Sequence, residues 1–338
     1  MKICVVGAGS VGGLITARIA RAQANKTIEP VSLSVLARGE TLKVLQQTGL
    51  TLYEPVAGRP GEFASQTWPV PAADDAHALG IQDLIVIAVK YNALATLAPQ
   101  LRPLIGPDTT ILSAMNGVPW WFTFGLDGEG ATLSLPAVDP EGRISAALPP
   151  DRVLGCVVHL AASRRGPAQI QVDLGNRLVI GEPMHHRSAR LARVGALLTG
   201  AGFDIEQVDD IHRVVWFKLW GNMTMNPVSA ITGAMSDTIL ADPQLRGFLS
   251  AVMREAARVG ARIGLPITDD PESRHAVTES LGGFRTSMLQ DALAGRSLEI
   301  DALVTIVREI AGQLDEHVPF TDALLGLIRV FAKTHQLD

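Results

Sequence analysis

A lysine and two asparagines share one face of an apolar segment in the second half of the chain. The segment VWFKLWGNMTMNP spans residues 215–227 and carries Lys218, Asn222 and Asn226 at four-residue spacing, which forms one stripe on an α-helix. A helix that is apolar nearly all round is buried, and a buried ammonium must pair or extend to water. The stripe therefore predicts either a lysine that reaches solvent or a site for a carbonyl and a carboxylate. Pro227 predicts that the helix ends or kinks at Asn226.

Two more polar residues directly follow apolar runs of strand length. Lys90 comes after LIVIAV at 84–89, and Asn116 comes after ILSAM at 111–115. In an open parallel sheet the carboxyl ends of the strands border the ligand crevice, so both side chains are candidates for it. The pair Asn116-Gly117 is equally typical of a plain turn.

A serine and a glutamate near the C-terminus are further candidates. Glu299 begins a predicted helix and lies on its apolar stripe, which continues through Leu303, Ile306, Val307, Ile310 and Leu314. An acid in the first turn also complements the helix dipole, so either role fits. Ser287 can bind a ligand or simply cap or start a helix.

The clearest motif is a glycine-rich turn after the short apolar run at residues 3–6. It consists of Gly7, Ala8, Gly9, Ser10, Val11 and Gly12 and matches G-x-G-x-x-G. The first glycine permits a tight turn, the second lets the backbone approach a pyrophosphate, and the third allows close packing of the following helix. In this strand–turn–helix context the motif predicts a dinucleotide site, with a turn that binds nothing as the alternative.

The residue after the second predicted strand, 31–36, indicates which dinucleotide binds. An enzyme that uses NAD usually carries Asp or Glu near this point, whereas this chain carries Arg38. A guanidinium can bind a 2′-phosphate through two hydrogen bonds, so we predict NADPH as the cofactor. Glu40 is the one nearby acid that would suit NAD, and a solvated surface arginine is the alternative for Arg38.

The elements that must position these residues change in character along the chain. Apolar strand-like runs alternate with amphipathic segments through the first two hundred residues, which predicts an α/β fold with a doubly wound, Rossmann-type sheet. Later strands are expected at 84–89, 109–113, 153–159 and 177–180. From about residue 210 the pattern is helical, with segments at 211–233, 243–264, 271–293, 298–315 and 320–334.

This change predicts two domains, as a length of 338 residues also favours. We expect a Rossmann NADP-binding domain at 1–209 and a mostly helical substrate-binding and catalytic domain at 210–338. The stretch at about 126–152 is rich in Gly, Pro and Asp and is expected to be an inserted loop or short hairpin.

Composition excludes several classes of protein. The net charge is −5 and lysines and arginines form no cluster, which argues against a nucleic-acid partner. No apolar run reaches the roughly 18 residues that cross a membrane, and the glycines of the N-terminal segment suit a strand and turn better than a signal peptide. We therefore expect a cytoplasmic protein. Cys4 and Cys156 are expected to be buried reduced thiols. The histidines at 159, 185, 186 and 212 lack the spacing of a zinc site.

Taken together, these features resemble the ketopantoate reductase family (2-dehydropantoate 2-reductases) over essentially the whole chain. The marks, in order, are GAGSVG at 7–12, Arg38, Val89-Lys90, Asn116-Gly117, KLWGN at 218–222, Asn226-Pro227, SMLQD at 287–291 and EID at 299–301. Each mark is weak alone, but their order and spacing are specific.

The resemblance implies that NADPH reduces a small 2-keto acid in the cleft between a Rossmann domain and a helical domain. The substrate it implies is 2-dehydropantoate, reduced to pantoate in pantothenate and coenzyme A biosynthesis. By position, Lys218 would be the general acid that protonates the carbonyl oxygen, and Glu299 would bind the hydroxyl of the substrate. Further substrate contacts would come from Asn116, Asn222, Asn226 and Ser287, and further cofactor contacts from Lys90 and Asn116.

One segment departs from the shorter members of that family. Trp120, Trp121 and the insertion that ends at Arg152 separate the Asn116 motif from the next strand, and the tryptophans either form the floor of a pocket or pack in a core. The exact keto acid and a homodimeric state therefore stay open. The alternatives are an NADP-dependent reductase or dehydrogenase for another 2-keto or 2-hydroxy acid, or a regulator that senses NADPH without catalysis. Lys218 and Glu299 argue against a regulator, which needs neither.

Overall fold

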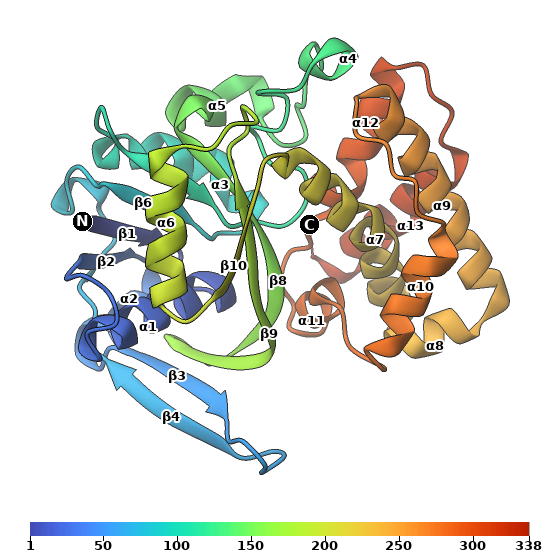
Figure 1. The fold of residues 1–338 in the computed structure, drawn as a ribbon. Helices are drawn as coiled ribbons and strands as arrows, with labels where there is room; N and C mark the ends of the chain where they lie inside the picture. Colours follow the sequence, from blue (N-terminus) through green and yellow to red (C-terminus); the bar gives the residue numbers. More distant parts are fainter. Residues whose placement is uncertain (338) are drawn as a thin grey trace. The chain divides into compact units, whose positions relative to one another are not determined.

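The computed structural model describes residues 1–337, which form two compact units (Figure 1). The sheet unit consists of Met1–Met115 and Arg143–Ile211, and the helical unit consists of Asn116–Gly142 and the residues from His212 onward. The segment 116–142, which the sequence assigned to the first domain, thus packs with the helices. Asp338, the last residue of the predicted second domain, lies outside the described residues.

The sheet unit is built on parallel strands at its centre. They lie in the order β5-β2-β1-β6-β7-β8, with each neighbouring pair parallel. Their bounds are β1 Lys2–Val6, β2 Ser32–Leu36, β5 Ala72–Ala73, β6 Leu84–Ile87, β7 Thr110–Ser113 and β8 Val153–Gly166. β6 and β7 are completely buried, as expected for central strands covered on both faces. The predicted α/β fold with a Rossmann-type sheet is confirmed.

Beyond β8 the sheet becomes mixed and curls. β9 (Gln169–Gly181) runs antiparallel to β8 and pairs in parallel with β3 (Leu50–Pro55) and with β10 (Asp204–Val208). β3 and β4 (Phe63–Trp68) form an antiparallel hairpin that extends away from the rest of the sheet unit (Figure 1). The sequence did not predict β3, β4 or β10. β4 reads FASQTW and is largely exposed, so it has no apolar run to mark it.

Helices cover this sheet, and α1 is central among them. α1 (Ser10–Ala24) packs against β8, β9, β3 and α6 (Ala189–Gly200), and its Leu14, Ile15 and Ile19 are completely buried. The remaining helices of the unit are α2 Gly39–Gln47, α3 Tyr91–Leu97 and α5 Arg143–Ala147, with 3-10 turns η1 Ala76–Ala78, η2 Ala98–Leu104 and η4 Pro150–Arg152. Because the glycine-rich turn joins β1 directly to α1, burial of the α1 face holds the turn in place.

The helical unit is arranged around a long buried helix, α7 (Ile211–Thr232). The other elements are α4 Gly128–Ala131, η3 Pro140–Gly142, α8 Ser236–Ala241, α9 Pro243–Arg262, α10 Pro271–Ser280, α11 Ser287–Leu293, the π-helix η5 Asp301–Thr305, α12 Ile306–Gln313 and α13 Pro319–His335. The prediction that Pro227 ends or kinks α7 at Asn226 is wrong about the end, since the helix continues to Thr232. Proline removes one helical hydrogen bond, but the packing of Trp216, Trp220 and Met223, each at most 1% exposed, holds the segment helical.

The predicted inserted loop or hairpin is instead a series of short helical turns, and its first part is tied to the helical unit. Glu129 of α4 pairs with Arg262 through hydrogen bonds of 2.6 and 2.8 Å, and Gln313 exchanges hydrogen bonds with the backbone of Ser134. The Glu309 carboxylate also accepts a 3.1 Å hydrogen bond from the Ala137 amide. These contacts explain why 116–142 belongs to the helical unit.

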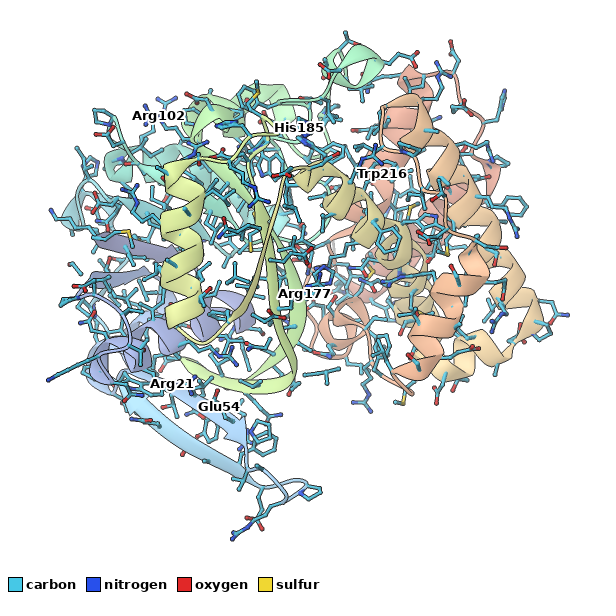
Figure 2. All side chains as sticks on the ribbon, in the orientation of Figure 1. Arg21, Glu54, Arg102, Arg177, His185 and Trp216 are labelled. Atoms are coloured by element: carbon cyan, nitrogen blue, oxygen red, sulfur yellow. The ribbon has the colours of Figure 1, made fainter. Side chains whose placement is uncertain are left out.

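The two tryptophans before the insertion pack in a core. Trp120 and Trp121 are at most 3% exposed, and the neighbouring Phe122 stacks on Trp216 of α7 with ring centres 5.9 Å apart (Figure 2 labels Trp216). Trp121 lies edge-on to His212 at 5.5 Å. The packing alternative for these tryptophans is therefore confirmed.

Two smaller expectations concern the thiols and the membrane. Cys4 and Cys156 are free and buried, and burial raises the pKa of the Cys4 thiol to about 11. Over residues 1–337, none of the helices combines the length and the apolar character that crossing a bilayer requires.

Candidate functional site

The glycine-rich turn has the conformation that its sequence demands. Gly7 has φ +93°, and a Cβ there would lie 2.6 Å from Val89 Cγ1 and 3.0 Å from the Ala88 carbonyl oxygen. A Cβ on Gly12 would collide with the Gly7 carbonyl. By contrast, a Cβ on Gly9 would meet nothing within 4 Å, so the space above Gly9 is open. The turn is therefore tightly packed at Gly7 and Gly12 and accessible at Gly9.

The start of α1 offers backbone donors to that open space. Gly9 is the N-cap and has no side chain to accept a hydrogen bond, and no acidic residue occupies the first turn. Ser10, Val11 and Gly12 begin the helix, and their N–H groups lie where the helix dipole is positive. This is the geometry that binds a phosphate group.

A pocket beside this turn brings several of the predicted cofactor residues together. Gly7, Ala8, Gly9 and Arg38 all border it. The other residues that line it are Leu36, Ala37, Thr41, Asp74, Val89, Ala93, Leu97, Gln100 and Arg164. Lys90 follows Val89 but is not among these residues; it is half-buried at the N-cap of α3.

Arg164 is a cationic pocket residue that the sequence did not predict. It lies on β8, 126 positions after Arg38, and the hairpin formed by β8 and β9 brings it to the pocket. Its neighbour Arg165 stacks on the rings of Tyr53 and Phe63 at 4.3 and 4.6 Å. Successive side chains of a strand point to opposite faces. The adjacent arginines Arg164 and Arg165 therefore had to place one guanidinium on each face of β8, and this is the sequence signal that could have indicated Arg164. Neither Arg38 nor Arg164 forms an ion pair within residues 1–337.

In the helical unit the lysine of α7 meets the predicted asparagine. Lys218 Nζ donates a 2.8 Å hydrogen bond to Asn116 Oδ1, and the lysine side chain is half-buried. The expectation that a buried lysine must pair or extend to water is thus met by pairing. Asn222 and Asn226 lie one and two turns further along α7; Asn222 is half-buried and Asn226 is 6% exposed.

The Asn116 turn is held in place by the segment that follows Glu299. Gly117 has φ +78°, and a Cβ there would run into the carbonyl of Ala302. The Val118 amide donates a 2.9 Å hydrogen bond to that same carbonyl oxygen. Lys218, Asn116 and the segment beginning at Glu299 are therefore close to one another.

One detail of this region differs from the sequence-based expectation, and one agrees with an alternative that the sequence left open. Glu299 is partly buried and precedes the helical segment, whose first residue is Ile300, and the segment opens with the π-helix η5. A π turn is rare and frequently marks a functional site. Ser287 is exposed and starts α11, while the cap is the Thr286 hydroxyl, which accepts a hydrogen bond from the Leu289 amide.

These features define a class: a Rossmann-fold protein with an anion-receptive glycine turn in its sheet unit and a positioned lysine in a separate helical unit. The family model "Ketopantoate reductase PanE/ApbA" matches residues 3–184, and the family model "Ketopantoate reductase PanE/ApbA C terminal" matches residues 210–332. The chain belongs to the ketopantoate reductase family and is an oxidoreductase that acts on a CH–OH/C=O group.

Individual relatives agree with this assignment. The 2-dehydropantoate 2-reductase of Mesorhizobium japonicum is 38% identical over 332 residues, covering 98% of each chain. The crystal structure of a candidate ketopantoate reductase from Ralstonia solanacearum MolK2 is 50% identical, covers 99% of each chain and superposes with a TM-score of 0.91. The ternary structure of D-mandelate dehydrogenase with NADH and anilino(oxo)acetate is 19% identical, covers all of both chains and has a TM-score of 0.81, which shows a shared fold.

Proposed function

We propose that the protein reduces a small 2-keto acid with NADPH, and that the substrate is 2-dehydropantoate, reduced to pantoate for pantothenate and coenzyme A synthesis. The observation that carries this proposal is the hydrogen bond between Lys218 Nζ and Asn116 Oδ1, which fixes an ammonium group at 2.8 Å from a defined partner. The name of the M. japonicum relative supports the choice of substrate.

The proposed cofactor residues, except Asn116, belong to the sheet unit. The N–H groups at the start of α1 bind the pyrophosphate above Gly9, and Arg38 and Arg164 bind the 2′-phosphate of NADPH. Two guanidinium groups that form no ion pairs within residues 1–337 favour a dianion over a bare ribose hydroxyl. When bound, NADPH supplies the hydride, and Lys90 orders the cofactor near its nicotinamide end.

The helical unit supplies the proton and the substrate contacts. The Asn116 amide orients the ammonium of Lys218, which donates a proton to the carbonyl oxygen as hydride reaches the carbonyl carbon. Glu299 accepts a hydrogen bond from the hydroxyl of the substrate, and the substrate's polar ends are bound by Asn222, Asn226 and Ser287. We further propose a homodimer, which light scattering tests.

A panel of 2-keto acids, with NADPH consumption followed by absorbance, tests the proposed function. The specificity constant should be largest for 2-dehydropantoate or another hydroxylated branched acid. Glu299→Ala should reduce it by roughly 10- to 100-fold for hydroxylated acids, the scale of a lost hydrogen bond to a charged group. Acids without the hydroxyl should change much less, since they leave no partner unpaired.

Glu316→Ala is the matched control, because Glu316 is an acid of the same unit that pairs with Arg258 and Arg262 instead. A uniform loss across the panel in Glu299→Ala would show that Glu299 supports its own helix and binds no hydroxyl. A wild-type protein that reduces none of the acids would refute the proposed function.

A further inference from the structure

An arginine on α10 lies against the same helix that carries Lys218. The Nε atom of Arg274 lies 2.9 Å, and Nη2 3.2 Å, from the position that a Cβ on Gly221 would occupy. The guanidinium carbon is 5.6 Å from the centre of the Phe217 ring. Gly221 is three residues, or just under one helical turn, beyond Lys218 on α7. The absence of a side chain at Gly221 therefore creates the space that the guanidinium fills.

Among the residues that the structure describes, this guanidinium has no anionic partner. Within residues 1–337 the guanidinium of Arg274 forms no ion pair or hydrogen bond, and its Nε is buried without an acceptor; only the backbone carbonyl of Arg274 accepts a hydrogen bond from the Thr278 hydroxyl. Burial lowers the pKa of Arg274, and no neighbouring charge contributes to the shift. Removing a charge from water without a partner is costly, so a site that holds such a charge gains most from an anion.

The acidic residues of α10 do not pair with Arg274 because they lie on the other face of the helix. Glu272 and Glu279 lie seven residues apart, on one face of the helix, and both pair with Arg246 of α9. Arg274 is two residues after Glu272, which places it on the opposite side, toward α7. The cation–π contact with Phe217 is within the usual range, but it leaves the positive charge unneutralised.

We propose that Arg274 binds the carboxylate of the 2-keto acid and thereby determines specificity for the charged substrate. This inference rests on the proposed function. A guanidinium is planar and binds a carboxylate through two parallel hydrogen bonds, which orients the acid as well as attracting it. In a 2-keto acid the carboxylate is bonded directly to the carbonyl carbon. Its anchor must therefore lie within about one helical turn of the group that acts on the carbonyl oxygen, as Gly221 and Lys218 do.

The test compares a 2-keto acid with its methyl ester, which keeps the carbonyl and lacks the charge. Arg274→Gln should raise KM for the acid by roughly 10- to 100-fold with kcat changed only a few-fold, and should leave the ester unaffected. Arg274→Lys keeps the charge but lacks the planar guanidinium, so its KM for the acid should fall between those of the wild type and Arg274→Gln. Arg254→Gln, which removes an exposed arginine of α9, is the matched control and should change neither substrate. An equal loss on acid and ester would assign Arg274 to packing and overturn the proposal.

Two further measurements keep the test decisive. Gly221→Ala crowds the guanidinium without removing it, and should give the same selective loss for the acid if Arg274→Gln fails to fold. Oxamate, which carries a carboxylate beside a carbonyl and is not reduced, should raise the Tm of the wild type but not of Arg274→Gln. Stabilisation by oxamate that depends on Arg274 in a protein without reductase activity would refute the proposed function alone. Equal stabilisation of both proteins by oxamate would refute the role of Arg274 alone.

Discussion

Partly buried arginines are handled differently in the sheet unit and in the helical unit. In the sheet unit, Glu182 is 1% exposed and accepts hydrogen bonds of 2.6 and 2.8 Å from Arg190, and another from Ser188. Arg21 and Glu54 form an ion pair between α1 and β3 (Figure 2). In the helical unit, Arg274 packs against α7, and within residues 1–337 no carboxylate pairs with it.

The difference separates residues that stabilise the fold from residues that we propose bind a ligand. Breaking a buried ion pair leaves an uncompensated charge, so the substitution lowers the stability of the fold. Removing a cation that has no partner in the protein leaves nothing uncompensated, so the loss appears in binding or rate. Arg38 and Arg164 in the pocket beside the glycine-rich turn belong to the second kind, because neither pairs with an acid of the described chain.

The largest expected effect tests the functional side of the comparison. Lys218→Ala should lower kcat by about 10²- to 10⁴-fold while NADPH still binds, because a positioned proton donor contributes on that scale. Turnover assays and titration of cofactor fluorescence separate the two steps. Lys333→Ala, at an exposed position of α13, is the control. Near-normal turnover in Lys218→Ala would mean that the lysine only packs against Asn116.

The structural side of the comparison predicts a loss of stability without a loss of chemistry. Glu182→Gln should lower the free energy of unfolding by about 3 to 5 kcal/mol, because Arg190 keeps its charge and loses its carboxylate. Urea unfolding measures this loss, and kcat per folded molecule should stay unchanged. A stable Glu182→Gln protein would show that this buried pair contributes little and would weaken the comparison.

The pH dependence of stability in the same variant tests whether Glu182 is charged in the folded protein. Burial alone would raise the pKa of Glu182, but hydrogen bonds from Arg190 and Ser188 outweigh it and hold the pKa below its ordinary value. A depressed folded-state pKa stabilises the protein above the pKa of the unfolded chain, and this stabilisation disappears as pH falls through the folded pKa. The stability difference between wild type and Glu182→Gln should therefore be full near pH 7 and shrink below about pH 4. A difference that is constant down to pH 3 would contradict a carboxylate that is charged in the folded state.

The smallest expected effect concerns the cofactor pocket. Arg38→Ala and Arg164→Ala should each raise KM for NADPH by about 10-fold and leave KM for NADH nearly unchanged, since each removes a charged hydrogen bond to the 2′-phosphate. Arg193→Ala, on an exposed face of α6, serves as the control in steady-state assays with both cofactors. A wild type that prefers NADH, or equal effects on both cofactors, would refute the assignment of these arginines.

The sequence by itself determined the features that depend on near neighbours along the chain. The turn from Gly7 to Gly12 requires glycine at fixed spacing, so both its position and its conformation follow from the residues alone. The continuous apolar runs of β6 and β7 and the apolar character of α7 likewise identified buried elements. The stripe of Lys218, Asn222 and Asn226 needed only the period of a helix. The roles of these residues stay predictions.

Only the tertiary structure decided which distant residues meet. It placed 116–142 with the helices, joined β10 and the β3–β4 hairpin to β9 through β3, brought Arg164 to the pocket of Arg38, and laid Arg274 over Gly221. No local pattern encodes these contacts, because each joins segments that are remote along the chain. Their pairing depends on which buried faces and hydrogen-bonding edges remain available once the rest of the chain has packed.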